Sequence, residues 1–344
     1  MSDLRPDDQD LPAPPDERIW VLDDPRAGPV ADAIGIAERL GAPFRRIPLA
    51  WNWLAPAVGL VGRGSLLGLA RASRNGLAGV PSAQAVRPGP ALVISAGHRA
   101  AAVSLWLQER CGSRVTHCMR PGIGGLRGYP PFDLVVISQH DRPRTAANVL
   151  PVLGTLHRIS PLVLRQAETA WRERLSHLPH PRVVLLVGGP LHGHDLVPAA
   201  AHRLGTMVSL LTAERRGTVL AMTSRHTGSE ATDALAAGLG HAMHVLYRWG
   251  EPGGNPYLGF LASADVIVVT ADSMAMISEA CVTTAPVFVA LPELASARHR
   301  RLIATLHGAG HLRLFARDLS GWPRVRLDEA ERVAAEVRRR FALA

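Results

Sequence analysis

Lysine is absent from this 344-residue chain, and cysteine is scarce. The 38 residues counted as lysine or arginine are therefore all arginine, and they give the chain a formal net charge of +9. This positive balance suits anionic partners, such as nucleotide diphosphates or an acidic lipid surface. The three cysteines form neither a disulfide framework nor a zinc-binding pattern, so the sequence favours a reducing compartment. We therefore expect a cytoplasmic protein that can associate peripherally with the inner membrane.

Signatures of several other protein classes are also missing. No Walker loop, G-x-S-x-G elbow or G-x-G-x-x-G fingerprint follows a predicted strand, which excludes kinase, hydrolase and dehydrogenase functions. The arginines are dispersed, without an aromatic-interleaved basic run, so nucleic acid is not the expected partner. The apolar segment from Trp51 to Leu77 is interrupted by glycines and arginines, and it is too broken and too charged to span a bilayer.

The sequence does contain a regular alternation of strands and helices. Short β-branched runs predict strands at 18–22, 44–49, 91–95, 114–119, 132–138, 182–187, 218–222, 243–249, 265–270 and 286–290. Helical patterns lie between most of these strands and at 298–306 and 328–341. This alternation predicts an α/β protein with doubly wound parallel sheets. Residues 1–17 are acidic and proline-rich, unlike a secretory signal, and we expect a disordered tail.

The stretch from Asn255 to Glu293 carries half of a nucleotide site by itself. Its strand is followed by Asp272 and Ser273, either of which can cap the helix that follows. Because this helix starts at the carboxyl end of a parallel strand, its free N–H groups form an anion seat, most naturally for phosphate. Glu279 lies two turns into the helix, where its carboxylate could reach the vicinal hydroxyls of a ribose.

Other polar residues follow strands that end at the same edge of the sheet. Gly188 and Gly189 allow a ligand to approach the backbone closely, although a tight turn with positive φ is the plainer explanation. Arg225 can neutralise a diphosphate with two directed bonds. Tyr257 could hold the nucleobase or serve as a core aromatic. The full ligand-binding set is Gly188, Gly189, Ser224, Arg225, Thr227, Asn255, Tyr257, Asp272, Ser273 and Glu279.

These segments resemble the second domain of GT-B glycosyltransferases. More narrowly, the chain is similar to bacterial members of the family named after the plant mitochondrial-fission "elongated mitochondria" (ELM) protein. The segments that carry the match are NPYLGFLASAD (255–265), VTADSMAMISEA (269–280), TSRHT (223–227), LLVGGP (185–190), FDLVV (132–136) with HD (140–141), and SAGHR (95–99). The resemblance implies two Rossmann-like domains facing a cleft, with a nucleotide-sugar as substrate in the second and no bound metal or cofactor.

The expected domain organisation follows from this resemblance and from the predicted elements. Residues 18–160 form an N-terminal acceptor domain, and residues 161–180 form a linker helix. Residues 181–326 form the nucleotide-sugar-binding domain, and residues 327–344 form a helix that crosses back onto the first domain.

Sugar transfer with inversion also needs a general base for the acceptor hydroxyl, in the first domain and facing the donor. His140 and Asp141 are favoured because they end a strand, and His98, which begins a helix, is the alternative. Asp23–Asp24 occupies an equivalent place after the first strand. Arg26 would hold an acceptor phosphate or the departing charge.

The sequence thus predicts a glycosyltransferase that transfers a sugar from a nucleotide-sugar to an envelope or lipid-linked acceptor. The alternative is a non-catalytic scaffold or adaptor protein at a membrane surface, as the role of the plant namesake implies. The triplet of His192, His194 and Asp195 lacks a further ligand at binding spacing, so no metal is expected. The segment from Trp51 to Arg74 either faces a membrane reversibly or packs under the first sheet.

Overall fold

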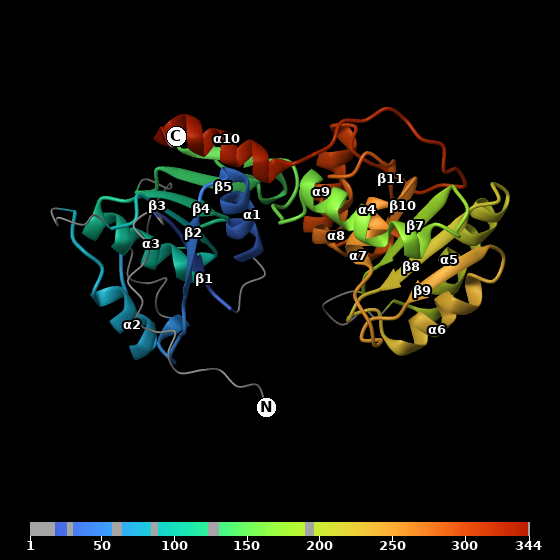
Figure 1. Ribbon diagram of the computed structural model, residues 1–344, viewed down its shortest axis with the longest axis horizontal. Coiled ribbons are helices and arrows are strands. Elements are labelled where there is room, and N and C mark those ends of the chain that lie inside the picture. Colours follow the sequence, from blue (N-terminus) through green and yellow to red (C-terminus); the bar gives the residue numbers. More distant parts are fainter. Residues whose placement is uncertain are drawn as a thin grey trace. The chain divides into compact units, whose positions relative to one another are not determined.

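The computed structural model describes residues 18–25, 30–56, 64–83, 89–122, 131–189 and 196–342. The chain divides into two compact units, each with one six-stranded sheet (Figure 1). Unit 1 takes the described residues up to Ile137, then Pro143–Pro151 and the last helix from Ala330. Unit 2 takes Ser138–Arg142 and Val152–Glu329. Two parallel sheets flanked by helices confirm the predicted α/β class.

The sheet of unit 1 has the strand order β2-β1-β3-β4-β5-β6. The pairs from β2 to β5 are parallel, and the register of the first pair sets Ile19 opposite Phe44. The elements of this unit are β1 (Ile19–Asp23), α1 (Val30–Leu40), β2 (Phe44–Pro48), α2 (Arg71–Ala78), β3 (Leu92–Ala96), α3 (His98–Cys111), β4 (Arg114–Cys118), β5 (Leu134–Ser138), β6 (Val149–Val152) and α10 (Glu329–Phe341).

Burial on both faces explains the continuous apolar runs of these strands. All five residues of β3 are buried, as expected for a central strand of a parallel sheet. Three strands contribute Leu22, Val93 and Ile137 to one core cluster. Helix α3 completes this cluster with Val103 and Leu107, which are fully buried.

The C-terminal helix α10 packs within unit 1. Its apolar stripe includes Val333 and Val337, which are fully buried. The Arg338 guanidinium donates a hydrogen bond from Nη1 to the carbonyl oxygen of Arg39 at 2.8 Å, which fixes α10 to the last turn of α1. Arg340 Nη1 reaches the carbonyl oxygen of Ala147 at 3.1 Å. The structure therefore groups this helix with the first sheet.

The sheet of unit 2 has the strand order β12-β11-β10-β7-β8-β9, and all of its pairs are parallel. Its elements are η2 (Gln139–Asp141), α4 (Pro161–Leu175), β7 (Arg182–Val187), α5 (Pro198–Ala213), β8 (Thr218–Thr223), α6 (Ser229–Gly238), β9 (Met243–Tyr247), α7 (Tyr257–Ala262), β10 (Val266–Thr270), α8 (Met274–Ala280), β11 (Val287–Ala290), η3 (Pro292–Leu294), α9 (Ala297–Gly308) and β12 (Arg313–Leu314).

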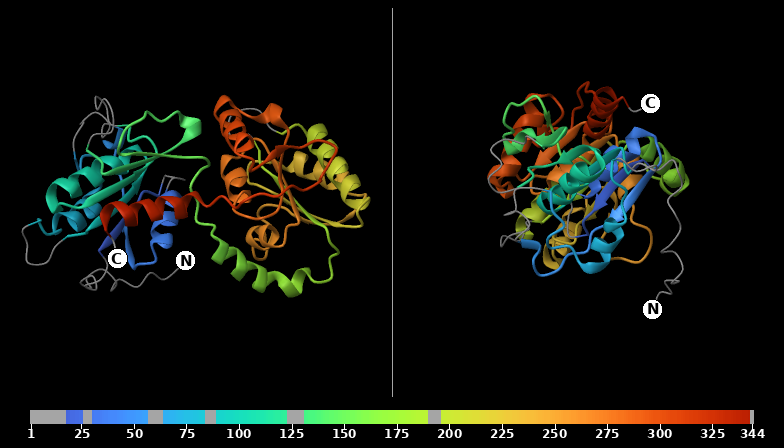
Figure 2. Two further views of the ribbon diagram at one scale, coloured as in Figure 1. Left: turned by 90° about the horizontal axis from the view of Figure 1, so that it is seen from above. Right: turned by 90° about the vertical axis from the view of Figure 1, so that its left-hand side faces the viewer.

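Alternate side chains of the central strand β7 enter two different cores. Val184 and Leu186 join a cluster that α4, α7, α8 and α9 complete. Val183 and Leu185 join a second cluster, to which α5 and α6 contribute. Because successive side chains of a strand point to opposite faces, helices cover both faces of this sheet (Figure 2). Unit 2 is therefore doubly wound.

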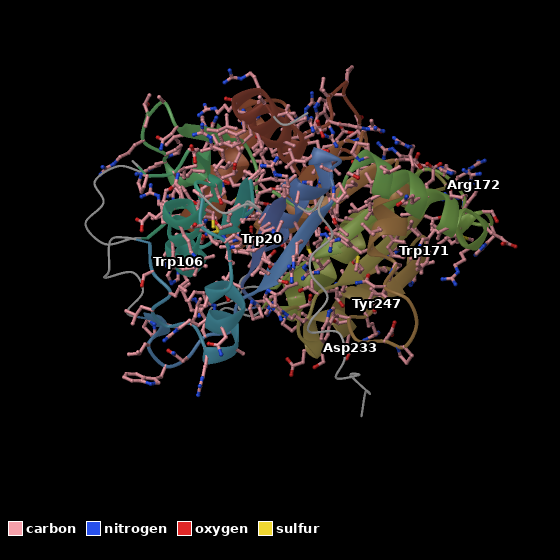
Figure 3. All side chains as sticks on the ribbon, turned by 60° about the vertical axis from the view of Figure 1, so that its left-hand side comes forward. Trp20, Trp106, Trp171, Arg172, Asp233 and Tyr247 are labelled. Carbon is pink, nitrogen blue, oxygen red and sulfur yellow. The ribbon has the colours of Figure 1, made fainter. Side chains whose placement is uncertain are left out.

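Helix α4, expected as a linker, packs within unit 2. Trp171 lies on this helix (Figure 3). Its ring meets the Phe260 ring edge-on, with 6.3 Å between ring centroids. The close approach requires Gly259, because a Cβ there would lie 2.3 Å from the Trp171 ring. The helix starts with a Ser160 cap, whose Oγ accepts a hydrogen bond from Val163 N at 3.1 Å. Packing on α7 thus makes α4 a part of the second core.

For the segment between residues 51 and 77, the sequence leaves open a reversible membrane contact or packing under the first sheet. Helix α2 lies at its end, and Leu77 and Leu69 are buried in the core of unit 1. Trp51 packs partly against the same core, whereas Trp53 is 84% exposed. Tertiary burial therefore orders this segment in spite of its weak helix propensity. Among the described helices, none has the length and apolar character that crossing a membrane requires.

Candidate functional site

A cavity of about 550 Å³ lies in unit 2 at the carboxyl ends of β7, β8 and β10. The expected ligand-binding residues that line it are Gly188, Gly189, Ser224, Arg225, Asn255, Tyr257, Asp272, Ser273 and Glu279. Its other lining residues are Met222, Thr223, His226, Trp249, Met274, Ala275, Met276 and His299. The parallel strands thus bring nearly the whole predicted set to one place, because their carboxyl ends share one edge of the sheet.

The two glycines after β7 are needed for close approach of other groups. A Cβ on Gly189 would lie 1.9 Å from the carbonyl oxygen of His226, where no side chain fits. A Cβ on Gly188 would lie 2.6 Å from Asp272 Oδ2. Neither glycine has a positive φ, so turn geometry does not explain them. The glycines let the loops after β7 and β8 touch, and this contact shapes the wall of the cavity.

Thr227 supports this loop contact without lining the cavity. Its side chain is 1% exposed, and its Oγ1 donates to the Gly188 carbonyl oxygen at 2.5 Å. Thr227 Oγ1 also accepts a hydrogen bond from Ser224 N at 2.9 Å. Arg225 is exposed beside these residues, and its Nε donates to His226 Nε2 at 2.8 Å. Thr227 therefore supports the loop from its buried side, and Arg225 lies on the exposed side of the loop.

The start of α8 separates the roles of two neighbouring residues. Ser273 is the cap of the helix, because its Oγ accepts a hydrogen bond from Met276 N at 3.3 Å. Asp272 does not cap it. The Asp272 side chain is 6% exposed, and neither of its carboxylate oxygens has a hydrogen-bond partner in the described part of the chain. A buried carboxylate with open acceptor positions therefore lines the cavity.

Glu279 and Tyr257 form a hydrogen-bonded pair in the cavity wall. The Tyr257 hydroxyl donates to Glu279 Oε2. Burial raises the pKa of the Glu279 carboxyl, and the hydrogen bond from Tyr257 opposes this shift. Burial and the adjacent carboxylate raise the pKa of Tyr257 well above its usual range, so its hydroxyl keeps the proton that it donates. Tyr257 therefore orients Glu279 rather than standing free to stack on a base.

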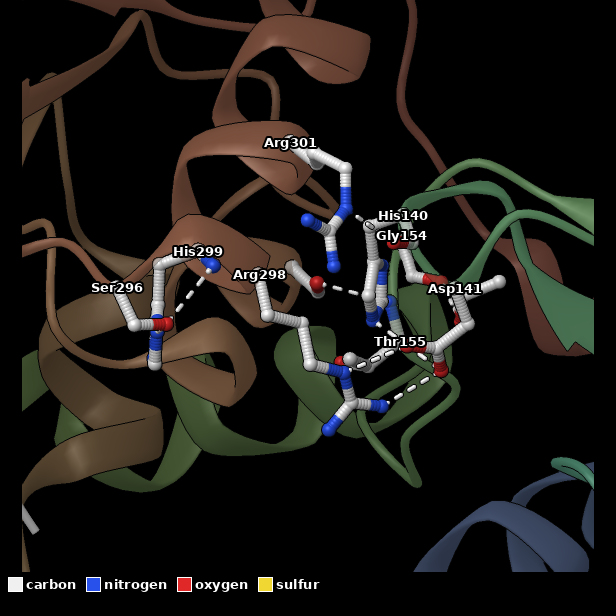
Figure 4. Close-up of polar contacts among 10 residues, drawn as sticks. His140, Asp141, Gly154, Thr155, Ser296, Arg298, His299 and Arg301 are labelled. Atoms are coloured by element: carbon white, nitrogen blue, oxygen red, sulfur yellow. Dashed lines mark hydrogen bonds and ion pairs between the residues drawn. The ribbon is translucent and has the colours of Figure 1, made fainter.

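His299 is a cavity residue that sequence reasoning missed. It lies on α9, where no strand end points to it, and only the Ser296 cap that precedes it could have drawn attention. The Ser296 Oγ is 2.6 Å from His299 Nδ1, which fixes the ring (Figure 4). Burial lowers the pKa of His299, and the nearby Asp272 carboxylate opposes this shift. Trp249, 59% exposed, also lines the cavity, while Tyr247 packs against the core.

His140 and Asp141 lie in unit 2, whereas the sequence predicts them in the N-terminal domain. The Arg298 guanidinium binds the Asp141 carboxylate through two hydrogen bonds of 2.6 Å (Figure 4). Arg301 Nε donates to the His140 carbonyl oxygen at 2.7 Å. These contacts to α9 explain why Ser138–Arg142 groups with unit 2. The His140 side chain is 1% exposed, and burial lowers its pKa to about 4.

The other expected catalytic residues belong to unit 1. His98 is exposed at the start of α3. Asp24 is buried, and its Oδ2 lies 3.3 Å from Arg99 Nε. Asp23 Oδ2 lies 2.5 Å from Arg46 Nη2. The predictions for residues 1–17, Arg26, His192, His194 and Asp195 lie outside the described ranges. Within those ranges, no group of three or more histidine, cysteine, aspartate or glutamate side chains is placed to hold a metal ion.

Comparison with known proteins identifies the family. A family model described as "Mitochondrial fission ELM1" matches residues 27–341. The chain belongs to this family. The mitochondrial fission protein ELM1 of Arabidopsis thaliana is 32% identical over 202 residues, which cover 57% of this chain and 46% of that protein. The uncharacterized protein RP120 of Rickettsia prowazekii (strain Madrid E) is 22% identical over 365 residues, covering 94% of this chain and 98% of that protein.

The fold of this ELM family member is that of GT-B glycosyltransferases. A solved structure of an Os79 variant from O. sativa in complex with UDP matches it with a TM-score of 0.52 and 11% sequence identity. This match covers 94% of this chain and 93% of the rice chain. At this identity the likeness speaks for the fold alone, and it agrees with two six-stranded sheets flanked by helices.

Proposed function

We propose that this protein is a metal-independent glycosyltransferase that takes a sugar from a nucleotide-diphosphate sugar and passes it to an envelope or lipid-linked acceptor. The observation that carries the proposal is the cavity of about 550 Å³ in unit 2, lined by the glycine loop, Arg225 and Glu279. Its volume lies in the usual range for small-molecule sites. The UDP bound to the rice protein of the same fold supports a nucleotide as the ligand class.

Each group in this cavity has a role that its chemistry supports. The carboxylate of Glu279, oriented by Tyr257, accepts hydrogen bonds from the two ribose hydroxyls. The exposed guanidinium of Arg225 attracts the diphosphate. Gly188 and Gly189 present backbone without side chains, so the diphosphate or the sugar lies close to the loop. Trp249 offers an exposed aromatic face for the nucleobase.

For the general base, the sequence favours His140 and Asp141 over His98, and the structure leads us to propose the reverse order. The carboxylate of Asp141 is held by Arg298, and the backbone carbonyl of His140 is held by Arg301, so both residues have a structural use. The imidazole of His140 is also withdrawn from solvent. His98 is exposed and therefore accessible to an acceptor hydroxyl. We assign the base first to His98, with His140 and Asp141 as the alternatives.

The contacts of His140 and Asp141 also favour a second function. In this function the protein is a non-catalytic scaffold or adaptor at a membrane surface. Arg298 and Arg301 attach the short helix η2 to α9, a role that needs no chemistry. Turnover decides between the two functions, because a scaffold neither hydrolyses nor transfers a sugar donor.

Nucleotide binding is tested first by thermal shift with UDP, GDP and ADP and their sugar conjugates, because a ligand of the native state raises the melting temperature. Glu279→Gln should weaken the stabilising nucleotide about ten- to a hundredfold, as expected for losing a hydrogen bond to a charged group. Glu293→Gln, an exposed residue of η3 away from the cavity, is the matched control. Equal affinity of the Glu279 and Glu293 variants would remove Glu279 from the site.

Catalysis is tested by hydrolysis of the same sugar conjugate in the absence of acceptor. His98→Ala should reduce the rate while leaving the dissociation constant of the nucleotide unchanged, because the base contacts the acceptor and not the donor. A wild-type protein that binds nucleotide without any hydrolysis or transfer would favour the scaffold. Full activity in His98→Ala moves the assignment to His140 and Asp141.

A further inference from the structure

The Asp272 carboxylate is the cavity group that the roles above leave unexplained. It is nine-tenths buried, it lines the cavity, and neither oxygen has a partner in the part of the chain that the structure describes. Burying an unpaired charge costs free energy, so native structures seldom keep one without a use. Helix capping is not that use, since Ser273 accepts the hydrogen bond from Met276 N.

No described group around Asp272 donates a hydrogen bond to its carboxylate. Gly188 lies against the carboxylate, but its backbone N–H donates to Thr270 Oγ1 at 2.9 Å. His299 is near, and its Nδ1 is paired with Ser296 Oγ. The space that a side chain would fill on Gly188 is instead left for the carboxylate. Among the described residues, none donates a hydrogen bond to the Asp272 oxygens, which are therefore open to donors of a ligand.

We propose that Asp272 determines the sugar specificity of the cavity, by accepting hydrogen bonds from hydroxyl groups of a neutral sugar attached to the nucleotide. This inference rests on the proposed nucleotide-sugar binding and names the substrate class within it. An ionised carboxylate only accepts hydrogen bonds, so it matches hydroxyl donors and repels anionic groups. A sugar that carries a carboxylate of its own is accordingly excluded, and bare nucleotide leaves the Asp272 oxygens without partners.

Two other ligands for this carboxylate fit less well. A phosphate placed here would meet a negative charge, so the diphosphate belongs nearer Arg225 on the exposed side of the cavity. A divalent cation needs several oxygen ligands, and the described residues offer no cluster of three candidate side chains. Hydroxyl groups need only the two acceptor oxygens that Asp272 supplies.

The variant Asp272→Asn gives the proposal two independent readouts, because it keeps the shape and removes the charge. Without ligand, the variant should melt at the same or a higher temperature than the wild type, since a buried unpaired charge is lost. With ligand, titration calorimetry compares matched pairs of probes: UDP with UDP-glucose, GDP with GDP-mannose, and ADP with ADP-glucose. UDP-glucuronate serves as the conjugate with an anionic sugar. Glu293→Gln is the control variant, because it removes the same charge as Asp272→Asn.

The expected result is a wild type that prefers the sugar conjugate of one pair over its bare diphosphate about ten- to a hundredfold, and that rejects the glucuronate. Asp272→Asn should reduce this preference to about onefold, with unchanged or tighter binding of the bare diphosphate. Equal losses for both members of the pair, or no change for either, would overturn the inference and leave nucleotide binding in place.

Three further outcomes can be distinguished from these. A preference that Asp272→Asn abolishes only with magnesium present, and that EDTA removes from the wild type, would overturn the inference in favour of a bound cation. A wild type that binds neither member of any of the three pairs would instead contradict the proposed function, on which the inference rests. A lower melting temperature of the unliganded Asp272→Asn protein would also count against it, because Asp272 would then have a structural partner.

Discussion

The carboxyl edges of the two sheets hold similar polar residues and use them in different ways. In unit 2, Thr227 donates a hydrogen bond to the backbone of the loop after β7, and the Asp272 carboxylate has no hydrogen-bond partner among the residues that the structure describes. In unit 1, the charged groups neutralise one another, as Asp24 does with Arg99. A paired charge is part of the scaffold, whereas a buried charge without a protein partner is available to a ligand. Residue type alone does not distinguish these two situations.

A side chain in the glycine loop of unit 2 should have the largest effect of the changes considered. In Gly189→Ala, the new Cβ would overlap the carbonyl oxygen of His226, so the loops after β7 and β8 must separate. We expect a loss of stability of about 3 kcal/mol, typical of overpacking, together with loss of nucleotide binding. Chemical denaturation and calorimetry measure the two effects. Gly254→Ala, which meets no atom within 4 Å, should change neither. Wild-type stability of Gly189→Ala would contradict the close approach.

In unit 1, the pH dependence of stability tests a buried carboxyl group, that of Asp32. Burial raises the pKa of Asp32, in the first turn of α1, from 3.8 to about 8. The folded protein therefore keeps a proton that the unfolded chain releases above pH 4. Stability should fall as the pH rises from about 4 to about 8, by up to about 1.4 kcal/mol per pH unit for this group.

Asp32→Asn should remove that fall, so its advantage over the wild type should grow between pH 5 and pH 8. Denaturant melts at several pH values measure it. Asp133→Asn is the contrasting control, because Asp133 accepts hydrogen bonds from Arg114 and from Val115 N, and its loss should destabilise the protein near neutrality. A constant difference between Asp32→Asn and wild type across this range would show that Asp32 is hydrated.

The contact between η2 and α9 should have an effect of about 1 kcal/mol. If the ion pair of Asp141 and Arg298 only stabilises the fold, Asp141→Asn and Arg298→Gln should each destabilise the protein by about that amount. The double variant should then lose little more stability than either single variant. A double-mutant cycle from denaturant melts measures this coupling. Additive losses, combined with loss of donor hydrolysis only in Asp141→Asn, would return Asp141 to the role of general base.

The smallest effect is expected on the surface of unit 1. Trp53 is 84% exposed, and Trp51 beside it is half-buried under Arg99, whose guanidinium lies 5.4 Å from its ring centroid. We expect Trp53→Ser to weaken flotation with anionic liposomes a few-fold and to leave stability within about 0.5 kcal/mol. Val325→Ser, at a position 79% exposed in unit 2, is the control. Equal flotation of both variants would argue against a membrane contact at Trp53.

The sequence was sufficient for the order of the central strands, because buried parallel strands leave continuous β-branched runs. Strand β7 has the predicted bounds, and the first residues of α4 and β8 are those predicted. Elements that depend on distant contacts escaped prediction. Helix α2 is ordered by burial of Leu77, and the two-residue strand β12 exists only through its pairing with β11. Such short elements have no periodicity of their own to read.

For the site, sequence determined which residues gather at the edge of the second sheet, since the carboxyl ends of parallel strands converge there. Only tertiary structure decided what each residue does. Thr227 lies under the loop, Tyr257 is bonded to Glu279, and His299 arrives from α9. The different roles of Ser273 and Asp272 rest on a hydrogen bond to the Ser273 side chain and on none to the Asp272 carboxylate within the described part of the chain. Adjacent residues share their sequence context, but burial and partners are set by chain segments far away, and these decide which side chain remains open to a ligand.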